Sequence, residues 1–331
     1  MGEGPTDAAG TTGDHRHLSD KVTHFTHTTH GRRTVPAVAS TGFDAGVARR
    51  TFRSLEAVHG MIYFTPDAPP EYAAAGISGN RAGYFASRSA ALGAATSDLV
   101  FATFFNFHPT LVHASMRDVW SNTTPTAMLD ARLRAVDVSL RRAFDDDLLA
   151  SSELADVAEL ARRAALVACE HPEGRPLFAA HAGLSWPDDV HLVLWHAQTL
   201  LREFRGDGHI GALVAEGLGG LDALIAHAAT GEVPAEALRL TRAWSAEEWS
   251  TGIESLRERG LVDGDGSFTD AGRAQREGIE ATTDRVSLAP YAAIGADGCA
   301  SVRKMGRRLT ELVLAAGLLI FDLDRLDDRE R

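Results

Sequence analysis

The chain has 331 residues, 44% hydrophobic and 24% charged, a balance that suits a globular protein burying one large core or two modest ones. Its formal net charge of −12 means that any attraction to nucleic-acid phosphate would have to come from a local basic patch. The two cysteines, Cys169 and Cys299, lie far apart in the sequence. We therefore expect neither a disulfide framework nor a cysteine zinc site, and we expect a reducing, cytoplasmic location.

Residues 1–44 differ in composition from the rest of the chain. Gly, Thr, Asp and His dominate this segment without helical or strand periodicity, which predicts a disordered tail. No apolar stretch follows the start, so we do not expect a signal peptide. His24, His27 and His30 have a spacing that could hold a soft metal on a helix, but no carboxylate accompanies them. We expect no metal site here or elsewhere.

From about Ala45 onward the sequence is a succession of alanine-rich segments with helical periodicity, separated by Pro- or Gly-bearing connectors. The expected helices cover Val47 to Tyr63, Ser97 to Trp120, Thr126 to Phe144, Ser151 to Glu170, Val190 to Arg205 and Leu218 to Ala229. A further apolar run, Leu309 to Phe321, is short for a membrane span and predicts a buried C-terminal helix. The fold class predicted is mainly α, multi-helical, with residues 45–235 as a helical ligand-binding region.

Aromatic, basic and histidine side chains gather in the first half of this region. Pockets for small molecules are usually apolar with a few polar anchors, and these segments have that composition. Core packing is the competing explanation for the phenylalanines and for each histidine by itself. The candidate ligand-binding residues are Tyr63, Arg81, Tyr84, Arg88, Phe104 and His108, and the candidate general acid or base is His59.

The segment Leu200 to His209 concentrates two arginines, an aspartate and a histidine at the end of an apolar helical pattern. Gly206 and Gly208 are predicted to end that helix, so that the side chains around them meet in one small volume. The candidate catalytic residues here are Asp207 and His209, and the candidate ligand-binding residues are Arg202 and Arg205. The alternative is a structural ion pair at a helix corner.

Residues 236–331 predict a MarR-like winged-helix portion followed by the C-terminal helix. Ser245 to Glu248 has the pattern of a capping box, and the segment Asp263 to Gly266 predicts the turn of a two-stranded wing between Leu261 and Phe268. A wing that enters a DNA groove needs Arg or Lys at its tip, but this tip carries Asp263 and Asp265. The expected recognition helix adds Glu254 and Glu258 beside Arg257 and Arg259. We therefore expect absent or weak DNA binding.

Six segments together resemble the SalK-type helix-turn-helix family of actinobacteria, which is found beside specialised-metabolite gene clusters. They are His59 to Phe64, Arg81 to Arg88, Phe104 to Pro109, Leu194 to His196, Leu201 to His209 and Glu280 to Asp284. The most specific signature is R-E-x-R-G-D-G-H, with Phe204 at the variable place. The resemblance covers about residue 45 to the C-terminus. It implies an all-helical protein with a winged-helix portion, and it implies no particular reaction.

Three classes of function fit these residues. A cofactor-free acid–base enzyme would use His59 or His209, with Asp207 as orienting group and the arginines on an anionic or carbonyl oxygen. A metabolite-responsive regulator would sense a compound in the same pocket, and a sequestering or resistance protein would only hold it. The Walker A, G-x-S-x-G and H-E-x-x-H motifs are absent. We prefer the enzyme, with no cofactor, a small and largely apolar ligand as partner, no DNA and no membrane partner, and a homodimer left open.

Overall fold

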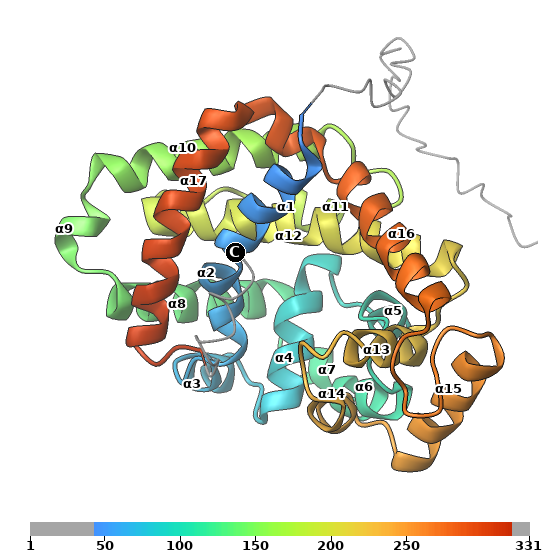
Figure 1. Cartoon of the computed structure of the whole chain (residues 1–331). Helices are drawn as coiled ribbons and strands as arrows, with labels where there is room; N and C mark the ends of the chain where they lie inside the picture. Colours follow the sequence, from blue (N-terminus) through green and yellow to red (C-terminus); the bar gives the residue numbers. More distant parts are fainter. Residues whose placement is uncertain (1–42, 320–331) are drawn as a thin grey trace, which may run out of the picture. The chain divides into compact units, whose positions relative to one another are not determined.

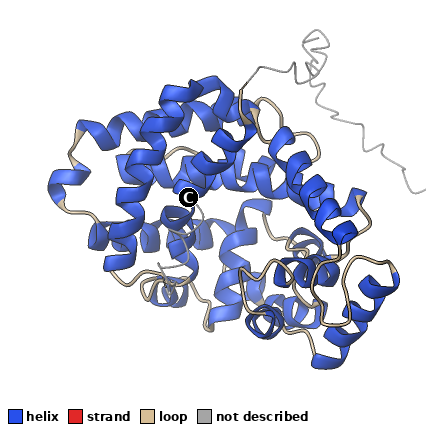
Figure 2. Ribbon diagram, viewed as in Figure 1, coloured by secondary structure: helices blue, strands red, loops and turns tan. Residues whose placement is uncertain are grey.

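The computed structural model describes residues 43–319, and every regular element in that range is a helix (Figure 2). The predicted mainly α fold class is confirmed. The expectations for the tail and for His24, His27 and His30 lie outside the described residues, apart from residues 43 and 44. Asp44 there begins the first helix, because its carboxylate accepts a hydrogen bond of 2.8 Å from the backbone N–H of Gly46.

The helices are labelled in Figure 1 and follow the chain from α1 to α17, with two short 3₁₀ turns, η1 and η2. Their bounds are α1 Ala45–Ser54, α2 Glu56–Gly60, η1 Met61–Tyr63, α3 Ala68–Ala74, α4 Asn80–Ser89, η2 Ala90–Leu92, α5 Ser97–Thr103, α6 Pro109–Met116, α7 Val119–Asn122, α8 Pro125–Ala143, α9 Asp146–Leu149 and α10 Ser152–Cys169. The remaining bounds are α11 Pro176–Ala182, α12 Val190–Ala215, α13 Gly220–Ala228, α14 Ala235–Arg242, α15 Ala246–Glu258, α16 Asp270–Val286 and α17 Ala289–Ala315.

The single helix expected over Ser97 to Trp120 is instead divided into α5, α6 and α7. Phe105 adopts a positive φ of 42°, which a helix does not tolerate, and Pro109 starts a new helix whose N-cap is His108. Residues 104–108 therefore form a loop between α5 and α6, which we call the joining loop.

The expected end of α12 at Gly206 and Gly208 is wrong, because the helix continues to Ala215. Neither glycine has a positive φ. Gly208 allows close packing instead, since a Cβ at this position would lie 2.9 Å from Cγ2 of Val286. With Gly211 these residues also fit a G-x-G-x-x-G spacing, but here it lies inside a helix that follows no strand, so it does not form the dinucleotide-binding turn.

A large apolar core surrounds α12, which packs against α10, α11 and α16. Buried aliphatic and aromatic residues occur around most of the circumference of this helix, including Leu194, Leu200 and Phe204. Figure 1 shows α12 crossing the view between α10 and α4. Among the described residues, no single helix has the length and apolar character to cross a membrane; the bent pair α12 and α13, 100° apart, passes on length and composition alone.

A second apolar core joins the end of α12 to α13, α14, α15 and α16. The predicted capping box is present, since Ser245 and Glu248 bond to each other's backbone N–H at the start of α15. The two strands expected over Leu261 to Phe268 shrink to one antiparallel bridge between Val262 and Phe268. The carboxylate of Asp263 accepts the N–H groups of Asp265 and Ser267, which makes a tight turn with very short arms.

The joining loop connects the two cores. The N–H of His108 donates to the carbonyl of Arg242 at 2.9 Å, and the indole of Trp244 donates to the carbonyl of Asn106 at 3.0 Å. The imidazole of His108 also lies 3.0 Å from a carboxylate oxygen of Glu248 on α15. A Cβ on Gly220 would lie 2.0 Å from the carbonyl oxygen of Phe105, so only glycine allows this approach.

Candidate functional site

The cluster predicted around Arg205, Asp207 and His209 does not form, because α12 is continuous there. Residues two apart on an α-helix point about 160° away from each other, whereas residues four apart share a face. Arg205 and His209 accordingly face α16, and Asp207 faces α11. The expectation that these side chains share one small volume is wrong.

Asp207 of α12 lies beside the start of α11, and its carboxylate accepts a 3.0 Å hydrogen bond from the backbone N–H of Phe178. Burial raises the pKa of this carboxyl group to about 6. His209 donates from Nδ1 to the hydroxyl of Thr283 at 2.9 Å, since that hydroxyl already donates its own proton to the carbonyl of Ile279. Burial lowers the pKa of His209 to about 4, so the ring is neutral near pH 7.

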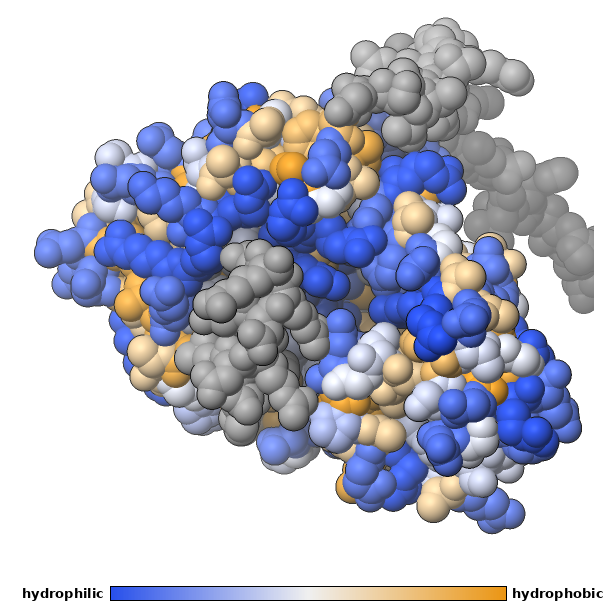
Figure 3. Space-filling model, viewed as in Figure 1, coloured by the Kyte–Doolittle hydropathy of each residue, from blue (hydrophilic) through white to orange (hydrophobic). Residues whose placement is uncertain are grey.

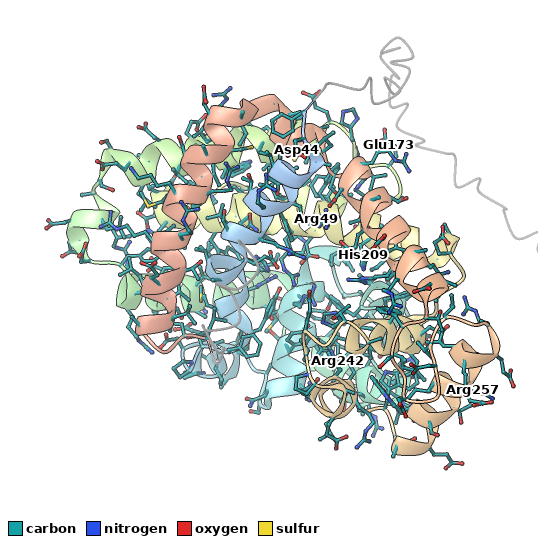
Figure 4. The ribbon with its side chains drawn as sticks, viewed as in Figure 1. Asp44, Arg49, Glu173, His209, Arg242 and Arg257 are labelled. Carbon is teal, nitrogen blue, oxygen red and sulfur yellow. The ribbon has the colours of Figure 1, made fainter. Side chains whose placement is uncertain are left out.

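The arginines that face α16 belong to a group that we call the outer ion-pair cluster: Arg49, Arg205, Arg276, Glu280 and Asp284. Arg205 reaches Glu280 at 3.3 Å and Asp284 at 2.8 Å. Arg49 also bonds to Asp284, and Arg276 lies 2.8 Å from Glu280. Each arginine therefore has a carboxylate partner. Figure 4 labels Arg49 on α1 and His209 on α12, which approach neighbouring residues of α16.

The buried His59 of α2 and the half-buried Tyr63 of η1 form a hydrogen-bonded pair with a defined direction of proton donation. The hydroxyl of Thr199 donates to the carbonyl of Trp195 and so accepts from Nδ1 of His59, at 3.0 Å. Nε2 of His59 is then an acceptor, and the hydroxyl of Tyr63 donates to it at 2.7 Å. Burial lowers the pKa of His59 well below its usual value, which agrees with a neutral ring.

Arg88 lies among three aromatic rings beside this pair. Its guanidinium carbon is 5.3 Å from the ring centre of Tyr63, 5.4 Å from that of Tyr84 and 4.4 Å from that of Phe104. It donates to the hydroxyl of Tyr84 at 2.8 Å and reaches Glu203 at 3.3 Å. Its Nε is buried without a partner. A donor that is buried and unused is the feature expected where a ligand binds.

Arg88 belongs to what we call the inner arginine cluster: Arg88, Arg202, Arg242, Glu56 and Glu203. Arg202 lies 3.4 Å from Glu56 and 3.5 Å from Glu203. Burial alone would raise the pKa of Glu203, but Arg88 and Arg202 lower it to about 2. Arg242 comes from the end of α14, lies 5.1 Å from the ring centre of Phe107 and interacts electrostatically with Arg88. Its Nε is also buried without a partner.

A pocket of about 330 Å³ opens next to this cluster, and Tyr63 and Tyr84 line it. We call it the tyrosine pocket. The other lining residues include Ile62, Tyr72, Ile77 and Ser87, so the wall is largely apolar. His59, Tyr63, Tyr84, Arg88, Phe104 and Arg202 lie close to one another. Of the predicted site residues, Tyr63 and Tyr84 line the pocket, and the others do not.

Three predicted residues lie elsewhere or act differently. His108 caps α6 and contacts Glu248, which is a structural position between the two cores. Arg81 is exposed on α4. Burial lowers the pKa of Arg242, and the charge of Arg81 lowers it further. Arg205 belongs to the outer ion-pair cluster.

Sequence analysis missed Arg132 and His181, which are both 2% exposed. Arg132 lies on the inward face of α8 between Met128 and Ala135, where the helical period demands an apolar residue. That position was the available signal. Burial lowers the pKa of His181 to about 4, and Arg132 contributes to this shift.

One group of side chains has the composition of a metal site: Asp137, Asp189 and His191. Arg141 donates to Asp137 at 2.8 Å and to Asp189 at 3.2 Å. Nε2 of His191 lies 2.6 Å from the same carboxylate of Asp137. The guanidinium thus supplies the positive charge that a cation would bring, and the group is explained as an ion-pair network.

The surface that corresponds to a recognition helix and wing is acidic. The exposed residues of α15 include Glu247, Glu254 and Glu258, and the following turn exposes Asp263 and Asp265. Arg257, labelled in Figure 4, is bound by Glu254 at 2.8 Å. Figure 3 shows hydrophilic side chains gathered over α15 at the lower right.

Comparisons with known proteins gave one match. A search of curated proteins and a search of solved structures found no significant similarity. A model of the helix-turn-helix family matches residues 48–320, which includes both apolar cores and both arginine clusters. Because this match covers most of the sequence, the chain belongs to the helix-turn-helix family.

Proposed function

We propose that the protein is a ligand-responsive member of the helix-turn-helix class that binds a small, largely apolar molecule with an anionic group. The observation that carries the proposal is the shared wall formed by Tyr63 and Tyr84. These two rings line the tyrosine pocket and also contact the guanidinium of Arg88. An apolar body would occupy the pocket while its anionic group reaches Arg88 and Arg202.

The charge of the inner arginine cluster supports an anion. The cluster contains three arginines and two glutamates, in a protein whose net charge is −12. The Nε donors of Arg88 and Arg242, which have no partner among the described residues, would gain one from a carboxylate or a similar group. A neutral amide of the same shape offers a carbonyl oxygen but no charge, so it would bind these donors more weakly.

The joining loop supplies a route from the ligand to the helix-turn-helix elements. Phe104, at one end of the loop, packs on Arg88. His108, at the other end, bonds to Arg242 on α14 and to Glu248 on α15. A ligand that repositions Arg88 would therefore act on both ends of this loop. Such a ligand shifts the protein between states only if it binds them unequally.

The R-E-x-R-G-D-G-H signature and the five other matching segments support a narrower assignment to the SalK-type branch. We infer from it that the ligand is a specialised metabolite and that the protein acts in the cytoplasm, in keeping with its free thiols Cys169 and Cys299.

Family membership supports a regulator that acts on DNA, but the acidic face of α15 disfavours tight binding through that helix. Phosphates facing Glu254, Glu258 and Asp263 are repelled at short range. We expect dissociation constants no tighter than about 10⁻⁶ M at physiological salt, as for non-specific binding. Fluorescence anisotropy with the DNA upstream of the gene tests this, and a salt-sensitive nanomolar complex would contradict it.

The ligand proposal is tested by calorimetry with two probes of equal shape, 2-naphthoate and its neutral counterpart 2-naphthamide. Wild-type protein should bind the carboxylate at least about tenfold more tightly, because only the anion pairs with the guanidinium. Arg88→Met should remove this preference, while Arg134→Gln, at an exposed position of α8 where the arginine pairs with Glu71 of α3, should keep it. Equal binding of the two probes by wild-type protein, or no binding of either at millimolar concentration, would sink the proposal.

A second candidate, a cofactor-free acid–base enzyme, is favoured by one observation. Tyr63 lines the pocket and its hydroxyl donates to the neutral imidazole of His59, so a proton could pass from a bound substrate to this pair. Incubation with a metabolite extract of the host in heavy water would test it. Deuterium incorporation that depends on Tyr63 in a Tyr63→Phe comparison supports the enzyme, and identical spectra reject it.

A further inference from the structure

Within residues 43–319, the side chain of Arg132 is a buried cation without a carboxylate partner. It is 2% exposed, and among these residues its one hydrogen bond runs from Nη1 to the carbonyl of Ser87, at 3.3 Å. Its Nε and Nη2 are both buried without a partner. Burying an unpaired charge is among the most expensive events in folding, so such a group implies a missing counter-charge.

Glu203 does not fill this role. It interacts electrostatically with Arg132, but it forms its ion pairs with Arg88 and Arg202. Nε and Nη2 together form the edge of a guanidinium that binds two oxygens of one oxyanion at once. That edge of Arg132 is the part left free.

Other unused polar atoms lie on the elements around Arg132. The indole N–H of Trp195, whose ring centre is 5.1 Å from the guanidinium, has no partner, and neither has the hydroxyl of Ser89. The imidazole of His181 donates from Nδ1 to the carbonyl of Leu177 at 2.9 Å, which leaves Nε2 as a bare acceptor. The 3₁₀ turn η2, directly after Ser89, packs against both α8 and α11.

We propose that Arg132 and His181 hold a small oxyanion that also carries an O–H group, such as hydrogen phosphate or hydrogencarbonate. Its oxygens would accept from the free edge of Arg132 and from Trp195. Its hydroxyl would donate to Nε2 of His181. This one chemical class satisfies both the unpaired donors and the unpaired acceptor, whereas a fully deprotonated anion leaves the histidine without a donor.

The site differs from the tyrosine pocket, although the two lie on either side of Ser87. Ser87 lines that pocket, and its carbonyl oxygen accepts the hydrogen bond from Arg132. The proposed oxyanion site is formed by buried atoms of Arg132 and His181, so it does not depend on whether the tyrosine pocket binds a metabolite.

Thermal unfolding of the full chain in phosphate, hydrogencarbonate, sulfate and chloride at equal ionic strength tests this site. Sulfate is the control, because it resembles phosphate in size but has no O–H at pH 7 and stabilises proteins by general exclusion. Wild-type protein should gain on the order of 5 °C in saturable fashion with phosphate, or with hydrogencarbonate if that is the occupant, and less with sulfate.

Arg132→Met should lose the saturable gain, and the matched variant Arg134→Gln on the same helix should retain it. If Arg132→Met does not fold, His181→Phe provides the test, since it keeps the fork of Arg132 and removes the acceptor. The advantage of the protonated oxyanion over sulfate should then disappear. Equal shifts in all oxyanions with wild-type protein, or an unchanged advantage in either variant, would overturn the proposal and leave buried water as the partner of Arg132.

Discussion

Two groups of arginines lie along the same helix, α12, and they differ in how completely their donors are used. In the outer ion-pair cluster Arg49, Arg205 and Arg276 each reach a carboxylate, and within the described part of the chain no polar atom of the cluster is buried without a partner. In the inner arginine cluster Arg88 and Arg242 each leave Nε unpaired by any described residue. The same residue type thus has its donors paired in the outer cluster and leaves donors free in the inner one, although Arg202 and Arg205 lie less than one turn apart on α12.

The surroundings of the two clusters explain this difference. The outer cluster lies between α1, α12 and α16. Helix α16 supplies both carboxylates, Glu280 and Asp284, opposite Arg205. The inner cluster is surrounded by aromatic rings, so Arg88 is held by Tyr63, Tyr84 and Phe104 as much as by Glu203. Aromatic faces stabilise a cation without using its N–H donors, and those donors remain free for a ligand.

The largest effect is expected from breaking the outer cluster. Asp284→Ala removes the carboxylate shared by Arg49 and Arg205 and leaves Arg205 with a single partner. Removing one member of a buried pair costs about 3–5 kcal/mol, and the partial exposure of Arg49 places the expected loss near the lower figure. Urea unfolding measures it. The affinity for 2-naphthoate should stay within about twofold, and a loss below about 1 kcal/mol would show that this cluster is not structural.

A smaller effect, with an opposite consequence for binding, is expected from Glu203→Gln in the inner cluster. The pKa of Glu203 is depressed from 4.5 to about 2, so its carboxylate stabilises the fold fully above pH 4.5, and that contribution is lost as the pH falls toward 2. The variant should lose up to about 3 kcal/mol at pH 7 and lack this acid-dependent loss. It should also bind 2-naphthoate about tenfold more tightly, because a competing anion is gone. Weaker binding would contradict the role of Glu203 as the internal counter-ion.

Periodicity and capping carried most of the fold prediction. The helix bounds expected for α8 and α10 agree with the structure to within about one residue, because their apolar faces and N-cap residues Thr124 and Ser151 are local signals. Pro109 was a local signal for the division of Ser97 to Trp120, because proline favours the first turn of a helix, whereas the positive φ of Phe105, in a loop that bonds to distant helices, could not be read from periodicity. Tertiary contacts of this kind leave no mark on local periodicity.

The site was predicted in part. Aromatic and basic residues around His59 and Arg88 meet as expected, because their segments carry both a buried face and polar groups. Asp207 was grouped with His209 on the assumption that glycines end helices, whereas Gly208 instead permits contact with α16. Arg132 was overlooked although a charged residue on an apolar stripe is a detectable exception. An interrupted pattern is therefore as informative as a motif.

A modest stabilisation is expected from Asp207→Asn, which sharpens the distinction between a reactive and a structural carboxyl group. Burial raises the folded pKa of Asp207 from 3.8 to about 6, so ionisation disfavours the fold progressively from pH 3.8 to 6 and by a constant amount above that. The asparagine keeps an oxygen to accept from Phe178 and removes the charge. The variant should be more stable by about 2 kcal/mol at pH 8 and equal to wild type at pH 4. A destabilised variant at pH 8 would show that the charge itself is needed.

The smallest effect is expected on the exposed face of α15, where the charged side chains are open to solvent, unlike those of the inner and outer clusters. Glu254→Gln removes the carboxylate that binds Arg257, and both side chains are about half exposed. Exposed pairs contribute little, so unfolding free energy should change by less than about 0.5 kcal/mol. Because Arg257 is then free to contact phosphate, non-specific DNA binding should release about one more counter-ion at most. The affinity for DNA should rise about threefold or less. Anisotropy titrations at several salt concentrations measure both quantities, with Glu247→Gln as the control that frees no arginine. A jump to nanomolar affinity from this one change would mean that α15 is a DNA-contacting helix held off by a single glutamate.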